Sequence, residues 1–185
     1  EKWCLKFTGA PKGESESSGP DMGLIYINGP KLDTIKAMKY FFDLNYYADL
    51  IRKEISVPET GLWYVVGFPE ELSDINAHQQ HLAGRVYLTA DKNYFERDGY
   101  DYFDFDFRSP HPGCVPSSLG GMSGGGVWHA RVFYDPSKGK VHIKENLDWL
   151  TLSGVSFYQS EVSDGGRSLR THGRKSIYVK LFEWA

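Results

Sequence analysis

The sequence predicts a mostly β fold with one helical insertion. Aromatic residues make up 15% of the 185 residues and there are 20 glycines, which is typical of strands joined by many turns. Several segments alternate between apolar and polar residues, most regularly residues 100–107, where three phenylalanines alternate with Asp104 and Asp106. A metal site on these two acids is an alternative, but a strand with one solvated face explains the alternation more simply.

The first sixty residues are expected to form two strands and a helical segment. Residues 2–7 and 21–27 have the pattern of strands, and a polar loop at 9–20 joins them. Between residue 33 and about residue 53, apolar side chains recur at helical spacing, which predicts a helix or a helix–turn–helix. Residues 45–47 (Asn-Tyr-Tyr) weaken the middle of this segment.

From residue 61 onward the pattern is that of strands. A hairpin is indicated at residues 135–139 (Asp-Pro-Ser-Lys-Gly), which have the composition of a turn between two strands. The last residues are expected to form a short helix. The predicted strands are residues 62–69, 82–88, 100–107, 127–134, 140–144, 150–159 and 176–181.

Composition excludes several functional classes. The net charge is −3 and no basic cluster is present, so nothing favours nucleic acid as a partner. No apolar run approaches the roughly 20 residues of a membrane helix. Two cysteines, Cys4 and Cys114, do not form a disulfide framework, although a single bond between them stays open. We therefore expect a bacterial, cytoplasmic protein, and the start at Glu1 without a signal-peptide pattern suggests a piece of a longer chain.

The most informative stretch is residues 119–128, in which Ser123 lies among five glycines and an apolar run follows. Glycines permit turns with positive φ and a close approach of the backbone to a ligand. A serine in such a turn can present its hydroxyl beside backbone N–H groups, as a nucleophile beside an oxyanion hole requires. A glycine-rich loop without a function is the simpler alternative.

The sequence Gly-Met-Ser-Gly-Gly leading into Val127 and Trp128 resembles the nucleophile segment of the trypsin-like (chymotrypsin-fold) serine peptidases. Ser123 matches the family's nucleophile. Asp21, directly before a short apolar strand and about a hundred residues upstream, matches its aspartate. The resemblance implies a double β-barrel. Residues 1–30 would be the end of the first barrel, 31–60 a helical connector, and 61–185 the second barrel.

The same resemblance implies how a polypeptide substrate would bind. The N–H groups of Gly121 and Ser123 would form the oxyanion hole. Ser117, six residues before the nucleophile, would lie at the base of the pocket for the side chain preceding the cut, where its neutral hydroxyl favours apolar or aromatic residues. No metal or organic cofactor is implied. The substrate backbone would pair with the strand residues Phe157, Tyr158 and Gln159.

Two features depart from the family pattern. Met122 stands where the animal enzymes have an aspartate that pairs with a newly formed amino terminus, so activation of that kind is not expected. No histidine precedes Asp21, although the family's general base does. Three explanations are open: an upstream or separate segment supplies the histidine, the chain is a catalytically inactive peptide-binding module, or a later histidine is the base. The candidates for a later base are His78, His81 and His172.

An esterase of the α/β-hydrolase type is a further alternative. Residues 121–125 also fit the Gly-x-Ser-x-Gly nucleophile elbow, with Asp148 or Asp164 and then His172 completing the order of residues. That elbow follows a strand and opens a helix, however, whereas glycines and a strand-like run follow Ser123. A phosphate-binding loop is not indicated, because no Lys-Ser/Thr pair follows the glycines.

Overall fold

A computed structural model describes residues 5–9, 21–27, 33, 36, 37, 42–53, 61–72, 74, 75, 80, 81, 84–89, 92–108, 115–143, 150–161 and 166–183. Residues 10–20 of the predicted loop and both cysteines lie outside this part. Within it, no helix has the length and apolar character needed to cross a membrane.

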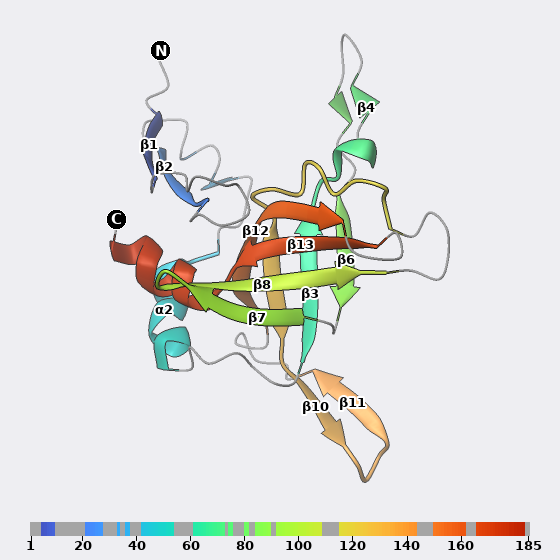
Figure 1. Cartoon of the computed structure of the whole chain (residues 1–185). Helices are drawn as coiled ribbons and strands as arrows, with labels where there is room; N and C mark the ends of the chain where they lie inside the picture. The colour runs from blue at the N-terminus through green and yellow to red at the C-terminus, as the bar shows by residue number, and fades with distance from the viewer. Residues whose placement is uncertain are drawn as a thin grey trace.

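The main element is a seven-stranded antiparallel sheet (Figure 1). This confirms the prediction of a mostly β fold. Strand β7 (Lys92–Arg97) and the polar strand β13 (Arg167–His172) were not predicted, whereas β8 (Tyr100–Phe107) has the bounds that its alternation predicts. The strands lie in the order β6 (Arg85–Thr89), β3 (Leu62–Gly67), β9 (Gly126–Ala130), β12 (Leu150–Glu161), β13 (Arg167–His172), β8 (Tyr100–Phe107) and β7 (Lys92–Arg97).

Smaller elements surround this sheet. The predicted hairpin is confirmed and projects away from the sheet in Figure 1, but residues 127–134 form two strands, not one, because the chain leaves the large sheet at Arg131. The two-stranded pairs are β1 (Leu5–Gly9) with β2 (Gly23–Ile27), β4 (Asp74–Ile75) with β5 (Gln80–His81), and β10 (Val132–Asp135) with β11 (Lys140–Ile143). The helical elements are α2 (Leu44–Lys53), a 3-10 turn (Glu70–Leu72), a π-helical segment (Ser176–Lys180) and a final 3-10 turn (Leu181–Glu183).

The large sheet curls around one apolar core. Trp63 on β3 contacts Phe103 and Phe105 on β8, with ring centroids 5.0 and 5.7 Å apart. Tyr87 on β6 contacts Phe107 on β8 at 5.4 Å. Strands β3 and β8 are separated by three strands in the sheet order, so these contacts require strong curvature. Among the described strands no hydrogen-bonded ladder closes the sheet into a barrel.

Residues 33, 36 and 37 are helical and a second helix, α2, begins at Leu44, which fits the helix–turn–helix alternative of the prediction. The Oδ1 atom of Asp43 accepts the N–H groups of Asn45 and Tyr46 at 2.9 and 3.2 Å, so Asp43 caps the amino terminus of the helix. Residues 45–47 therefore start the helix and do not interrupt it. The buried face of α2 packs on the carboxy-terminal helical segment through Ala48, Ile51, Ile177 and Tyr178.

The prediction of a strand at residues 176–181 was wrong, because this segment is helical. Its apolar residues do suit a strand, but the buried carboxylate of Asp101 caps the start of the helical turns. Asp101 accepts the N–H groups of Lys175 and Ser176 at 3.0 and 2.6 Å and the Ser176 hydroxyl at 2.7 Å. The cap stabilises a helical start that the local sequence does not specify.

We expect Asp101→Asn to lower the free energy of unfolding by about 2 kcal/mol, because an amide replaces one of the two acceptor oxygens and leaves buried donors unpaired. Urea unfolding followed by circular dichroism measures the change. Asp49→Asn is the matched control, since the Asp49 side chain is 86% exposed on α2 and its removal should change stability by less than about 0.5 kcal/mol. Equal effects of the two substitutions would contradict the capping role of Asp101.

Candidate functional site

The loop that carries Ser123 is held by two buried side chains. Leu119 and Met122 are 2% and 0% exposed and belong to the core of the large sheet, whereas Ser123 is exposed. The carbonyl of Gly120 accepts the N–H of Glu70 at 2.7 Å, which ties the loop to the turn after β3. Because the residues before Ser123 are fixed from inside, its side chain is presented outward.

Three glycines are required by the geometry of this loop. Gly121 and Gly124 have φ angles of +83° and +80°, which other L-residues adopt only at a cost. A Cβ at Gly121 would lie 2.5 Å from the carbonyl oxygen of Phe68, and one at Gly125 would lie 2.3 Å from that of Val66. The glycines therefore allow the loop to lie directly against β3.

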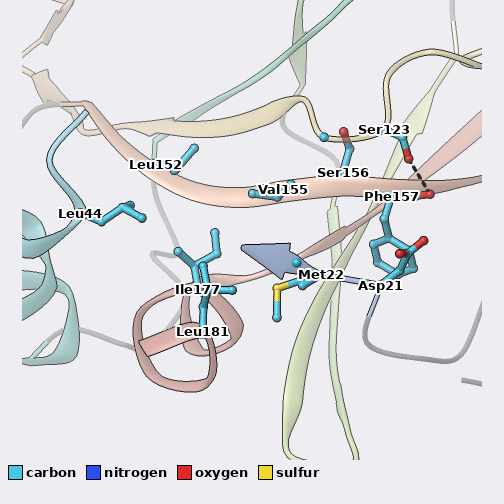
Figure 2. Close-up of a pocket in the computed structure, with 12 residues that line it drawn as sticks. Asp21, Met22, Leu44, Ser123, Leu152, Val155, Ser156, Phe157, Ile177 and Leu181 are labelled. Atoms are coloured by element: carbon cyan, nitrogen blue, oxygen red, sulfur yellow. Dashed lines mark hydrogen bonds between the residues drawn. The ribbon is translucent and has the colours of Figure 1, made fainter. Parts of the chain in front are cut away.

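Strand β12 fixes the other side of the loop. Ser156 donates its N–H to the carbonyl of Gly125 at 2.9 Å and accepts the N–H of Gly124 at 2.7 Å. The register with β13 shifts between Ser156 and Tyr158, so Phe157 is the extra residue of a β-bulge. The carbonyl of Phe157 accepts the Ser123 hydroxyl at 3.0 Å (Figure 2).

The N–H groups of Gly121 and Ser123, which the family resemblance assigns to an oxyanion hole, have no hydrogen-bond partner among the described residues. The N–H groups of Met122 and Gly124, in contrast, donate to carbonyls at 3.0 and 2.7 Å. An exposed serine and two backbone donors without a partner are the groups from which an oxyanion hole would be built.

A cavity of about 380 Å³ opens beside Ser123, and Asp21 lines it as well. Figure 2 shows these two residues toward one end and apolar side chains of α2 and the carboxy-terminal turns toward the other. The structure thus brings the two predicted catalytic residues to one cavity, and no hydrogen bond joins them in the described residues. The apolar lining consists of Met22, Leu44, Leu152, Val155, Phe157, Ile177 and Leu181.

Among the described histidine side chains, none is hydrogen-bonded to Ser123. His172 is fully buried and neither of its ring nitrogens has a partner. His129 is buried against Trp63, with ring centroids 4.7 Å apart, and His142 is exposed on the hairpin. The other candidates lie outside the described residues: His78 entirely, His81 in its side chain, and the acids Asp148 and Asp164 of the esterase alternative.

Two of the predicted substrate-binding residues, Ser117 and Gln159, are hydrogen-bonded to neighbouring residues. The Ser117 hydroxyl donates to Glu71 at 2.5 Å, and this bond, with the N–H of Ser118, lowers the pKa of the Glu71 carboxyl. Gln159 accepts the N–H of Leu119 at 2.6 Å, so its side chain braces the serine loop. Glu71 could not be identified from the sequence, because nothing in its local sequence indicates a contact with a residue 46 positions away.

Strand β12 has a free edge beside the serine loop. Its residues pair with β9 only as far as Val155, whereas its pairing with β13 continues to Glu161. Beyond the contacts of Ser156 with the loop, the described residues provide no strand on the β9 side of Phe157 and Tyr158. An unpaired strand edge is where an extended peptide can add.

Comparison with known proteins finds no match for the chain among family models, curated proteins or solved structures. Function is therefore inferred from the geometry of the serine loop, the cavity and the edge of β12.

Two glycine substitutions test the loop geometry. Gly124→Ala should destabilise the protein by about 1 kcal/mol, because a Cβ there meets only the cost of a positive φ and no atom within 4 Å. Gly121→Ala has nearly the same φ but also collides with the Phe68 carbonyl, so we expect a loss of about 3 kcal/mol. Chemical denaturation measures both changes, and similar losses would contradict the packing of Gly121 on β3.

His172 should make stability pH-dependent. Burial lowers the pKa of His172 from 6.5 to about 4, so between these values the unfolded chain binds the proton more tightly. The free energy of unfolding therefore keeps its full value above pH 6.5 and falls as the pH decreases toward 4. The expected loss is about 3 kcal/mol. Urea unfolding at pH 4 to 7 should show this loss in the wild type and not in His172→Phe. If the difference in unfolding free energy between wild type and His172→Phe did not change with pH, this prediction would be wrong.

Proposed function

We propose that the chain is the nucleophile-bearing part of a trypsin-like serine endopeptidase. The observation that carries this proposal is the exposed Ser123 in an anchored turn, beside the unpaired N–H groups of Gly121 and Ser123. Two further features favour a functional loop over a simple surface turn. Gly121 fits tightly against the carbonyl of Phe68, and Ser123 lines the same cavity as the acid Asp21.

In the proposed reaction, the Ser123 hydroxyl attacks the carbonyl carbon of a peptide bond while its proton passes to a histidine. The negative charge on the carbonyl oxygen is stabilised by the N–H groups of Gly121 and Ser123. The histidine then protonates the departing amine, which leaves an ester between the acyl group and Ser123. Water, deprotonated by the same histidine, hydrolyses this ester and restores the serine.

The histidine is proposed to come from an upstream or separate segment. A base must reach Ser123 and an acid must orient it, and Ser123 and Asp21 line the same cavity of about 380 Å³, which a side chain from that segment would enter. The apolar remainder of the cavity suits the packing of neighbouring side chains of that segment. The later candidate that the structure describes, His172, is buried against other rings and makes no bond with Ser123.

The curled sheet supports the second barrel of a chymotrypsin-like fold for residues 61–185. Contacts of β3 and β6 with β8 across the core are those expected when a sheet wraps toward closure. The pair β1–β2, separate from the large sheet, suits the end of a first barrel within residues 1–30, and α2 suits a connector within 31–60.

The substrate is proposed to be an extended polypeptide paired with β12. The free edge at Phe157, Tyr158 and Gln159 lies next to the serine loop, so a peptide on this edge would pass Ser123. Ser117 would contact the side chain that precedes the cut, as the resemblance implies.

A second candidate is a peptide-binding module that does not cut. The Ser123 hydroxyl donates to the Phe157 carbonyl, and no described base accepts its proton, so the same edge could hold a peptide without chemistry. The esterase alternative has less support. Its elbow belongs to a parallel sheet and precedes a helix, whereas this sheet is antiparallel and β9 follows Ser123.

Reactivity with a fluorophosphonate tests the proposal. The 185-residue chain alone should label slowly and cleave peptides near background, because a triad lacking one member retains only about 10³–10⁴-fold acceleration over water. Joined to the upstream coding segment, it should label rapidly at Ser123, as peptide mapping by mass spectrometry would show. Ser123→Ala should abolish labelling and cleavage.

Exposed Ser137 provides the matched control, since Ser137→Ala on the hairpin turn should leave the labelling rate unchanged. Fast labelling of the isolated chain would mean that one of its own histidines is the base. An inert longer protein would refute the peptidase and leave the binding module, to be measured as peptide affinity that survives Ser123→Ala.

A further inference from the structure

The imidazole of His172 is the least explained buried group in the described chain. It is 0% exposed, and neither ring nitrogen has a hydrogen-bond partner. Burying an unpaired polar group costs free energy, and an apolar ring of the same shape would avoid that cost. Stability alone therefore does not explain a histidine at this position.

The ring of His172 lies in an aromatic stack with Phe157. The two centroids are 4.5 Å apart and the planes 25° from parallel. Tyr102 of β8 lies on the same ring at 5.0 Å and Tyr100 at 6.2 Å. Phe157 is thus held by a ring from β13, which is itself enclosed by rings from β8.

Phe157 connects this stack to the proposed nucleophile. It is the extra residue of the β12 bulge, and bulges re-aim side chains and release backbone groups from the ladder. Its carbonyl accepts the Ser123 hydroxyl at 3.0 Å, and its ring lines the cavity beside Ser123. A shift of Phe157 would therefore move both the hydroxyl of Ser123 and the strand edge offered to a peptide.

We propose that His172 is a positioning residue for Ser123. Its neutral ring packs on Phe157 and holds the β12 bulge in place, a contact that we call the lock. This inference rests on the proposed function for its effect on reactivity, but the lock itself does not depend on catalysis. The ring, and not its nitrogens, makes the contact, so a phenyl ring should replace it at neutral pH. Protonation should release the lock, because a charged imidazole cannot stay buried without a partner.

The groups around His172 supply no counter-charge for an imidazolium. Strand β8 presents the phenols of Tyr100 and Tyr102, and β12 presents Phe157 and Val155. Asp101, next to Tyr102 on β8, is already bonded to Lys175 and Ser176, and Arg170 on β13 pairs with Asp104.

The test compares His172→Phe, His172→Ala and the exposed control His142→Phe in the whole chain. Fluorophosphonate labelling of Ser123 is followed by intact mass, with Ser123→Ala as the blank. At pH 7, His172→Ala should label about tenfold more slowly, since small misplacements of reacting groups have effects of this size. His172→Phe and the control should keep the wild-type rate. At pH 4, where about half of the wild-type ring is protonated, the wild-type rate should fall about twofold relative to His172→Phe.

Hydrogen exchange of the peptide covering residues 154–161 supplies a readout that needs no reactivity. His172→Ala should speed the exchange of the amides in this peptide that pair with β13 about tenfold, and His172→Phe should not. If Ser123 labels in no variant but exchange responds as expected, the lock stands and the peptidase fails. A loss of labelling or protection at pH 7 in His172→Phe would overturn the lock, even if His172→Ala does not fold. So would an unchanged rate and unchanged protection in a folded His172→Ala.

Discussion

The site depends on two hydrogen bonds between Ser156 of β12 and the glycines that follow Ser123. They dock the serine loop on the strand, and they form only because Gly125 has no Cβ to collide with the carbonyl of Val66, which would lie 2.3 Å away. With the loop docked, the Ser123 hydroxyl reaches the bulge carbonyl of Phe157. The cavity, the free edge of β12 and the two unused N–H groups all meet at this junction.

Interactions distant from Ser123 shape the rest of the site. The buried carboxylate of Asp101 caps the carboxy-terminal turns, and these turns bring Ile177 and Leu181 to the cavity. Helix α2 packs on the same turns and adds Leu44 to the cavity wall. The apolar side of the cavity is therefore a product of the helical packing, whereas its polar side comes from the serine loop and from Asp21, just before β2.

The sequence predicts the elements whose signal is local. Strand β8 alternates between apolar and acidic residues, and the glycines around Ser123 indicate the turn. Strand β13 could not be predicted in this way, because its buried residues include Ser168, Thr171 and His172, so a polar sequence occupies the middle of the sheet. The carboxy-terminal turns were predicted as a strand because their cap lies 75 residues away in sequence. Only the family resemblance predicts that Asp21 and Ser123 lie at one cavity. No periodic pattern in the chain indicates that these two residues are close.

A crystal structure of the chain joined to the upstream coding segment, with a peptide boronic acid at saturating concentration, would test the central claim most directly. Boron bonded to Ser123 Oγ would mimic the tetrahedral intermediate, and the account predicts one boronate oxygen about 3 Å from both the Gly121 and the Ser123 nitrogens. The peptide should lie along Phe157 and Tyr158 as an added strand. A structure without a Ser123 adduct, or with every boronate oxygen directed away from those N–H groups, would contradict the assignment of this turn as an oxyanion hole.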